Sequence, residues 1–131
     1  MRGFNKYNVS PKKDRTVYGI VFDSKWEMQA YLILKDSLPS NARMELSPKY
    51  ELQPKFRDLN GKAVRAIHYI GDFLVTHRGK VYLIDTKGFE TDVFKMKEKM
   101  FKFKNQDMEI IKIKSKKRLN ELISIIKSYE S

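Results

Sequence analysis

Two aspartates and a lysine in the middle of the chain are of the types that could carry out hydrolytic chemistry on a phosphate ester. Asp72 and Asp85 have 12 residues between them, and Lys87 stands two positions beyond Asp85. Carboxylate oxygens are the protein ligands that Mg²⁺ prefers, and a nearby ammonium can stabilise a negatively charged phosphate or orient a water. These residues therefore predict a divalent-metal site suited to phosphodiester cleavage.

The residues around these side chains predict a β-hairpin. Two apolar runs, Ala66–Thr76 and Lys80–Thr86, are joined by a short loop that contains a glycine. With a two-residue loop Asp72 faces Asp85, which brings their Cβ atoms to about 5 Å. The period of two residues puts Lys87 on the same face as Asp85. Facing carboxylates destabilise an apolar sheet unless a positive charge lies between them, so the pairing favours a cation site.

Each of these residues also has a simpler interpretation. Asp72 and Asp85 could be solvent-facing residues at turns or strand ends, although aspartate is disfavoured in the middle of a strand, where the apolar neighbours of Asp72 put it. Lys87 could form only a salt bridge. A β-bulge at Gly71 would alter the pairing, or would aim Asp72 at the site.

Composition and charge indicate a globular protein with a polyanionic partner. The chain has 131 residues, 41% of them hydrophobic, and a net charge of +11. The positive charge is concentrated in residues 1–15 and 95–131, which favours DNA binding over a merely soluble lysine-rich surface. The lack of cysteine excludes disulfides and thiolate chemistry. With neither a membrane-spanning run nor a signal peptide, we expect a cytoplasmic protein without a membrane partner.

Hydrophobic periodicity predicts a flexible basic arm at residues 1–15 and a single domain at residues 16–131. The expected order is α-β-β-β-α-β-α, an α/β fold with a central mixed sheet flanked by helices on both faces. The predicted helices are Lys25–Ser37, Asp92–Asn105 and Lys117–Tyr129, and the predicted strands are Tyr50–Phe56, Ile67–Thr76, Val81–Thr86 and Met108–Lys114. The helix stripes expected to be apolar are Val93, Met96, Met100 and Phe103 in the second helix and Leu119, Leu122, Ile123 and Ile126 in the third.

Four segments carry a resemblance to a known superfamily. They are Phe22-Asp23-Ser24-Lys25-Trp26-Glu27, Tyr50-Glu51-Leu52-Gln53-Pro54, Tyr69-Ile70-Gly71-Asp72-Phe73 and Ile84-Asp85-Thr86-Lys87-Gly88. With the Asp-x12-Asp-x-Lys spacing, they resemble the PD-(D/E)XK nucleases, and among these the small phage-encoded endonucleases and Holliday-junction resolvases. The resemblance covers roughly residues 17–104. Gly71 stands where the motif's name has proline, and Asp85 replaces the commoner glutamate.

The resemblance implies a restriction-endonuclease-like fold and a set of functional residues. It implies that Lys87 is catalytic and that one or two Mg²⁺ or Mn²⁺ ions are bound by Glu27, Asp72, Asp85 and the backbone carbonyl of Thr86. The local sequence offers another role for Glu27, because Ser24-Lys25-Trp26-Glu27 matches a helix capping box.

Further polar residues near these segments have weaker signals. Gln53 could position a water or a phosphate, or could be an exposed strand residue. Lys95 and Lys97 could hold phosphate, or could lie on a solvated helix face. His68 and His77 lack partners at the spacing of a zinc site or a catalytic triad, so we expect them to be structural or exposed.

Taken together, the residues and the resemblance predict a metal-dependent DNA endonuclease. No separate recognition module is left over in 131 residues, so structure-selective cutting of branched or junction DNA is expected, in phage DNA recombination or processing. Two-fold related cuts would require a homodimer. The alternative is a non-catalytic DNA-binding or interaction protein on the same fold, and a third interpretation is a nuclease that acts on RNA.

Overall fold

The computed structural model describes residues 10–129, which form an α/β protein of two compact units. One unit contains residues 10–40 and 115–129, and the other contains residues 41–114. Of the predicted basic arm, residues 1–9 lie outside the described residues, whereas Lys12–Arg15 forms the short 3₁₀ helix η2. None of the helices in residues 10–129 is long and apolar enough to cross a membrane.

The unit of residues 10–40 and 115–129 is built on two helices. Helix α1 (Lys25–Ser37) and helix α3 (Lys116–Ser128) pack against each other. Strand β1 (Thr16–Val17) pairs with β2 (Ile20–Val21), and both precede α1 in the chain. The bounds of both helices agree with prediction within one residue. The apolar stripe predicted for α3 is confirmed, since its buried residues are Leu119, Leu122, Ile123 and Ile126.

The unit of residues 41–114 contains a four-stranded mixed sheet. Its strands are ordered β10 (Ile110–Ile113), β9 (Lys80–Thr86), β8 (Phe73–His77) and β3 (Arg43–Leu46). The β10–β9 pair is parallel and the other two pairs are antiparallel. The two strands that carry the predicted site, β8 and β9, are therefore the central ones, as their apolar composition predicted. Strand β3 has no counterpart among the predicted elements.

The hairpin register derived from the sequence is confirmed, but the first of its strands is shorter than predicted. Leu74 pairs with Leu83, and the ladder ends at Phe73 opposite Ile84. The predicted strand Ile67–Thr76 is broken at Gly71 and Asp72, which divide it into β7 (Ile67–Ile70) and β8. Asp72 therefore lies at a strand junction rather than in the middle of a strand, and the prediction on this point was wrong.

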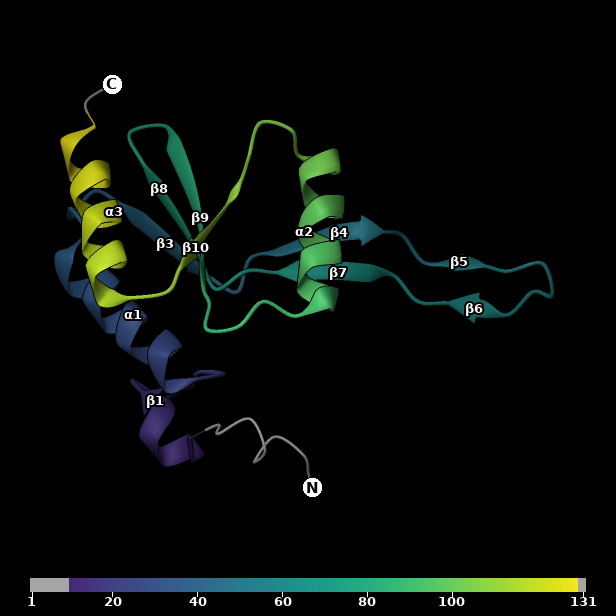
Figure 1. The fold of residues 1–131 in the computed structure, drawn as a ribbon, viewed down its shortest axis with the longest axis horizontal. Coiled ribbons are helices and arrows are strands. Elements are labelled where there is room, and N and C mark those ends of the chain that lie inside the picture. The colour runs from purple at the N-terminus through teal and green to yellow at the C-terminus, as the bar shows by residue number, and fades with distance from the viewer. Residues whose placement is uncertain (1–9, 130–131) are drawn as a thin grey trace. The chain divides into compact units, whose positions relative to one another are not determined.

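The two strands on either side of this break have different partners, which is the physical reason for it. Strand β7 pairs with β4 (Lys49–Gln53), while β8 pairs with β3 and β9. The ribbon formed by β4 and β7 continues into a narrower hairpin, in which β5 (Phe56–Arg57) pairs with β6 (Ala63–Val64). In Figure 1 this ribbon leads away from α2 and ends in the loop beyond β5 and β6.

Helix α2 (Asp92–Lys104) begins at an N-cap, because the side chain of Thr91 accepts a hydrogen bond from the backbone of Phe94. It packs on β4 and β7 through Phe94 and Phe101. Together they contribute to a hydrophobic core cluster of this unit, whose buried residues are Leu52, Tyr69, Leu83, Phe94, Phe101 and Ile110.

The apolar stripe predicted for α2 was wrong at three of its four positions, since only Met100 is half-buried and packs against the core. Val93 and Met96 are each 58% exposed and Phe103 is 77% exposed, whereas Phe94 and Phe101 are buried. Both sets of residues have helical spacing, so the pattern alone cannot decide between them. The tertiary contacts decide, because the rings of Phe94 and Phe101 pack against the aromatic rings of β4 and β7.

Candidate functional site

Asp72 is positioned by backbone hydrogen bonds on both sides of the strand break. Its N–H donates to the carbonyl of Ile84 in β9 at 3.2 Å, and its carbonyl accepts from the N–H of Ser47 at 3.0 Å. The preceding residue, Gly71, donates its N–H to the carbonyl of Pro48 at 2.9 Å. The chain is thus held beside β9 at the point where it passes from β7 to β8.

The structure explains why glycine occupies position 71. A Cβ atom there would lie 2.9 Å from Cδ1 of Leu83 and 3.3 Å from the hydroxyl oxygen of Tyr69, so a side chain would crowd both. Proline, which the motif's name has at this position, would also lose the hydrogen bond to Pro48 because it has no N–H. The surroundings of position 71 therefore favour glycine.

Thr86 binds the Asp72 carboxylate with two groups. Its backbone N–H and its hydroxyl both donate to Oδ2 of Asp72, at 2.8 Å and 2.6 Å. This double contact ties the strand junction to the end of β9 and fixes the orientation of the carboxylate. Thr86 was predicted to contribute its carbonyl as a metal ligand, and that role stays a prediction.

Asp85 lies at the centre of a buried polar cluster. Its Oδ2 accepts a hydrogen bond from the hydroxyl of Tyr69 at 2.6 Å and forms an ion pair with Nζ of Lys87 at 3.2 Å. Asp85 is 3% exposed. The structure therefore brings Asp72, Asp85 and Lys87 together at the ends of β8 and β9, and it adds Tyr69 from β7. We call these four residues the carboxylate cluster.

The electrostatics of the cluster favour a bound positive charge. Burial raises the pKa of Asp85 to about 6, and the charge of the Asp72 carboxyl acts in the same direction, while Tyr69 and Lys87 oppose the increase. The pKa of Tyr69 is raised by burial and by the charge of Asp85, so its hydroxyl stays protonated and donates to Asp85. Even with Lys87 present, the pair of carboxylates retains a proton more readily than an isolated aspartate does.

Lys87 is held between its carboxylate partner and an aromatic ring. Its Nζ lies 3.9 Å from the centre of the Phe94 ring, a cation–π contact that complements the ion pair with Asp85. Helix α2, which carries Phe94, is fastened to β10 by the ion pair of Glu98 with Lys112 at 3.0 Å. The lysine is therefore positioned by two different elements, β9 and α2.

Glu27, the remaining predicted ligand, belongs to the other unit. It takes part in a variant of the capping box at the start of α1. Its N–H donates to the hydroxyl oxygen of the N-cap residue Ser24 at 3.0 Å, and its Oε1 accepts from the N–H of Asp23, the residue before the N-cap, at 3.0 Å. Over residues 10–129, no three or more His, Cys, Asp and Glu side chains are grouped so that they could hold a metal ion. The role of Glu27 as a metal ligand stays a prediction.

The other candidate residues, Gln53, Lys95 and Lys97, lie on the predicted strand and helix. Gln53 ends β4 and is half-buried, beside an irregularity in its pairing with β7. On α2, Lys95 is exposed and Lys97 is half-buried, and their contact with phosphate stays a prediction. The structural role expected of the histidines fits His77, which is buried, with its Nε2 3.2 Å from the side-chain oxygen of Asn41.

Two residues of the site were missed from the sequence. Tyr69 was noted only as part of an apolar strand, and Phe94 was not singled out at all. A signal for Tyr69 was available, since it stands three positions before Asp72 and a buried tyrosine hydroxyl needs a polar partner. Phe94 had no comparable signal, because its approach to Lys87 depends on how α2 packs.

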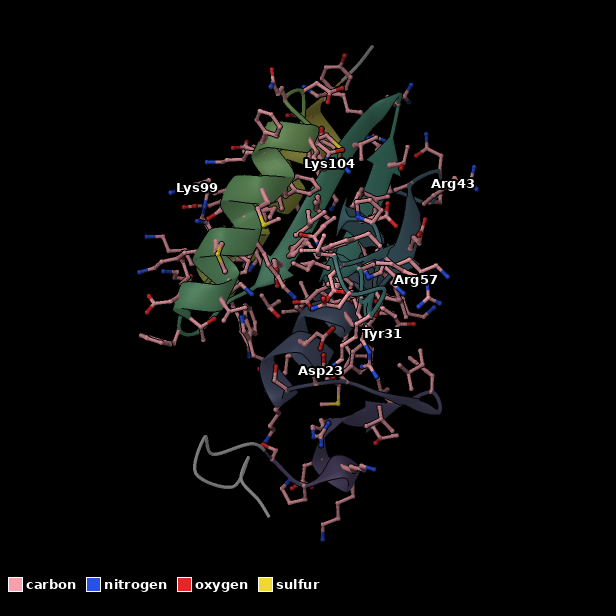
Figure 2. The ribbon with its side chains drawn as sticks, turned by 90° about the vertical axis from the view of Figure 1, so that its right-hand side faces the viewer. Asp23, Tyr31, Arg43, Arg57, Lys99 and Lys104 are labelled. Carbon is pink, nitrogen blue, oxygen red and sulfur yellow. The ribbon has the colours of Figure 1, made fainter. Side chains whose placement is uncertain are left out.

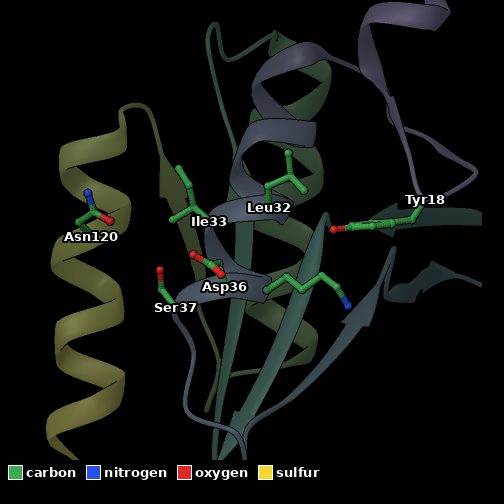
Figure 3. Close-up of a pocket in the computed structure, with 7 residues that line it drawn as sticks. Tyr18, Leu32, Ile33, Asp36, Ser37 and Asn120 are labelled. Atoms are coloured by element: carbon green, nitrogen blue, oxygen red, sulfur yellow. The ribbon is translucent and has the colours of Figure 1, made fainter.

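A surface hollow of about 650 Å³ lies in the unit of residues 10–40 and 115–129. Figure 3 shows Asp36 and Ser37 of α1 between Asn120 of α3 and Tyr18. None of its lining residues was predicted to be functional. The carboxylate cluster, which contains the predicted residues Asp72, Asp85 and Lys87, is therefore the candidate site.

The residues described above define an α/β protein in which a buried carboxylate, Asp85, lies beside the half-buried Asp72 and a lysine. Residues 4–120 match the profile of the family DUF1064, which is described as a protein of unknown function, and the chain belongs to this family. Neither the curated proteins nor the solved structures contain a match to the chain.

Proposed function

We propose that the protein is a metal-dependent DNA endonuclease of the PD-(D/E)XK type, with a restriction-endonuclease-like fold. The observation that carries the proposal is the convergence of Asp72, Asp85 and Lys87 at the ends of two central strands. A buried carboxylate whose pKa is raised by burial and by the charge of a second, half-buried carboxylate is typical of functional sites. The sequence spacing and the geometry thus agree on the same three side chains.

The residues fit a hard divalent cation. Mg²⁺ or Mn²⁺ is bound by proteins through one or two carboxylates, with waters and substrate phosphate completing the coordination. Asp72 and Asp85 would hold the ion, and its charge would offset the burial and the neighbouring Asp72 charge that raise the pKa of Asp85. When bound, such a metal lowers the pKa of a water and neutralises charge on the leaving oxygen.

The other members of the cluster would orient these groups. Thr86 holds the Asp72 carboxylate, and Tyr69 holds the Asp85 carboxylate, each through an oxygen-donated hydrogen bond of 2.6 Å. Lys87 could move from Asp85 to the phosphate when the substrate enters, because its side chain is 18% exposed. There its ammonium would stabilise the negative charge of the pentacovalent phosphate.

The substrate proposed is DNA, gripped by its backbone. The net charge of +11 gives a salt-sensitive attraction that does not depend on sequence. Branched or junction DNA is the substrate that the superfamily resemblance favours. Symmetric cuts on two strands would be made by a homodimer.

The decisive experiment is a metal-dependent cleavage panel on linear, flapped and four-way DNA. We expect nicking in Mg²⁺ or Mn²⁺ that EDTA abolishes. Lys87→Ala and Asp85→Asn should abolish it as well, while circular dichroism shows both variants folded. Equal cutting by the wild type and both variants would contradict the proposal, and so would binding without any turnover, the result expected of a non-catalytic DNA-binding protein.

Glu27 can be tested separately from its capping role. Glu27→Gln keeps a side chain that can close the capping box, so α1 should remain stable. If Glu27 is a ligand, this variant loses cleavage at an unchanged melting temperature. If the carboxylate acts only as a cap, cleavage persists, and the metal is held without it.

A further inference from the structure

A slender hairpin extends from the unit of residues 41–114. It comprises residues 54–66, in which Phe56 pairs with Val64 and Arg57 pairs with Ala63. We call this segment the basic hairpin. Figure 1 shows its two strands, β5 and β6, continuing beyond β4 and β7 and past helix α2 of the same unit. At about 3.3 Å per residue, the six residues from Pro54 to Leu59 can reach at most about 20 Å beyond the end of β4.

The tip of the basic hairpin is a hydrogen-bonded turn. Oδ1 of Asp58 accepts from the N–H groups of Asn60 and Lys62, each at 2.9 Å, and the backbone of Asp58 exchanges further bonds with Gly61 and Lys62. Gly61 has a φ of +78°, which an L-residue rarely adopts. The carboxylate of Asp58 is thus hydrogen-bonded within the turn, and these bonds, rather than core packing, hold the tip in a defined shape.

Positive charge gathers on one face of the basic hairpin. Period-2 alternation puts Lys55 and Arg57 on the same face, and the pairing of Arg57 with Ala63 puts Arg65 there too. All three are exposed. With Lys62 as a fourth basic residue and Asp58 as the acidic residue of the segment, its net charge is +3.

A protruding structure of this kind needs a partner to explain its exposed apolar residues. Leu59 at the tip is 101% exposed and Phe56 is 50% exposed, although two-stranded hairpins are only marginally stable by themselves. The major groove of B-DNA is about 12 Å wide and admits a two-stranded β-ribbon. The deep, narrow major groove of duplex RNA does not admit side chains.

We propose that the basic hairpin inserts into a groove of duplex DNA, with Lys55 and Arg65 contacting backbone phosphates and Leu59 entering the groove. The inference deepens the proposed nuclease function, on which it rests for the identity of the substrate. The basic hairpin would then be a DNA-recognition element, which was not expected from the sequence. The substrate is then DNA with a duplex arm beside the cleaved bond.

The test measures binding of a 30-base-pair DNA duplex in EDTA by fluorescence anisotropy across a salt series. The variant Lys55→Gln/Arg65→Gln should lower affinity about tenfold and reduce the slope of log K against log salt by about 2. The matched control is Lys99→Gln/Lys104→Gln on α2, which removes the same charge from exposed lysines of the same unit. Figure 2 shows Lys99 and Lys104 on α2 and Arg57 on the hairpin side of this unit.

The control should keep the wild-type slope within about half a unit. Equal loss in both variants, or no loss in the hairpin variant, overturns the inference, because only net charge would then matter. A larger loss on duplex RNA than on duplex DNA overturns it as well.

A second readout locates the tip on the DNA. Since the chain has no cysteine, Leu59→Cys introduces a unique thiol for a photo-crosslinker. We expect this derivative to crosslink to the duplex, and Lys99→Cys to crosslink at most weakly. The reverse pattern overturns the inference.

The two proposals fail separately. Metal-dependent cutting with unchanged duplex binding in the hairpin variant contradicts the inference and leaves the nuclease intact. Hairpin-dependent binding without cutting by any preparation contradicts the nuclease and leaves the basic hairpin as a DNA contact.

Discussion

The carboxylate cluster and the basic hairpin show how differently the same kinds of charge behave when buried and when exposed. In the cluster, Asp85 is 3% exposed and its pKa is raised to about 6, so each charge depends on its neighbours. In the hairpin, Lys55 and Arg65 are exposed and their charges are solvated. Buried charges strongly affect both stability and chemistry, whereas exposed ones act mainly on the approach of a charged partner. Four predictions sharpen this comparison.

The largest effect is expected for Asp85→Asn on cleavage. The amide keeps the shape of the side chain but loses the charge that would hold a divalent cation. We expect a decrease in the cleavage rate of at least about 100-fold, the range seen when a single electrostatic group is removed from an active site. The measurement is single-turnover cleavage in Mg²⁺ with the hairpin variant Lys55→Gln/Arg65→Gln as the comparison.

The hairpin variant should lose affinity but retain its rate at saturating protein. A similar rate defect in both variants would mean that the two regions do not differ in the way proposed.

The next effect concerns stability in the absence of metal. Because the pKa of Asp85 is higher in the folded state than in an unfolded chain, its contribution to stability is fully present at low pH. It is lost as the pH rises from about 4 to above 6, by about 3 kcal/mol at most, since each pKa unit corresponds to about 1.4 kcal/mol. Urea unfolding in EDTA at pH 4 and pH 7 measures this loss.

Between pH 4 and pH 7, the free energy of unfolding of Asp85→Asn should therefore fall less than that of the wild type, with a difference of up to about 3 kcal/mol. Addition of Mg²⁺ at pH 7 should raise the melting temperature of the wild type and not that of the variant. If the stability of the wild type and of the variant changed with pH in the same way, the ionisation of Asp85 would not be the cause of the loss.

An intermediate effect is expected for Phe94→Leu. The substitution removes the ring that lies 3.9 Å from Nζ of Lys87 while keeping an apolar residue in the core. A cation–π contact contributes about 0.5–2 kcal/mol, so cleavage should decrease about 2- to 30-fold through loss of lysine positioning. Phe94→Tyr retains the ring and serves as the control.

The comparison must be made at equal folded fraction, because Phe94→Leu also changes core packing. If Phe94→Leu and Phe94→Tyr cleave equally well, the ring does not position Lys87.

The smallest effect is expected for the tip of the basic hairpin. Leu59→Ala removes a side chain that is 101% exposed, so the free energy of unfolding should change by no more than about 0.5 kcal/mol. The matched control is Leu83→Ala in β9, where the side chain is 1% exposed and the cost should be about 2–5 kcal/mol. Thermal denaturation measures the stability of both variants. A large loss of stability in Leu59→Ala would mean that the Leu59 side chain packs against another part of the protein.

Sequence reasoning succeeded where local rules govern the structure. The register of the β8–β9 hairpin follows from its loop length and alternation, so the pairing of Leu74 with Leu83 was predictable. Helix α1 begins after Ser24 because its capping box is a local signal. In α3 four of the five apolar residues form a single stripe, so the buried face is clear and only Ile125, 52% exposed, lies off it.

It failed where two local patterns compete. Helix α2 has one apolar set at Val93, Met96 and Phe103 and another at Phe94 and Phe101, and only packing against β4 and β7 selects the second. The run around Gly71 likewise continues as a strand in the local pattern. The chain breaks there because the flanking residues pair with different strands.

The sequence by itself determined the types of the charged groups in the carboxylate cluster, their spacing and the register of the hairpin beside them, because these depend on residue order, loop length and a period of two. Only the tertiary structure decided that Tyr69 hydrogen-bonds Asp85 and that Phe94 lies against Lys87. Both contacts join residues from different elements, and the burial that raises the pKa of Asp85 exists only once those elements have packed together.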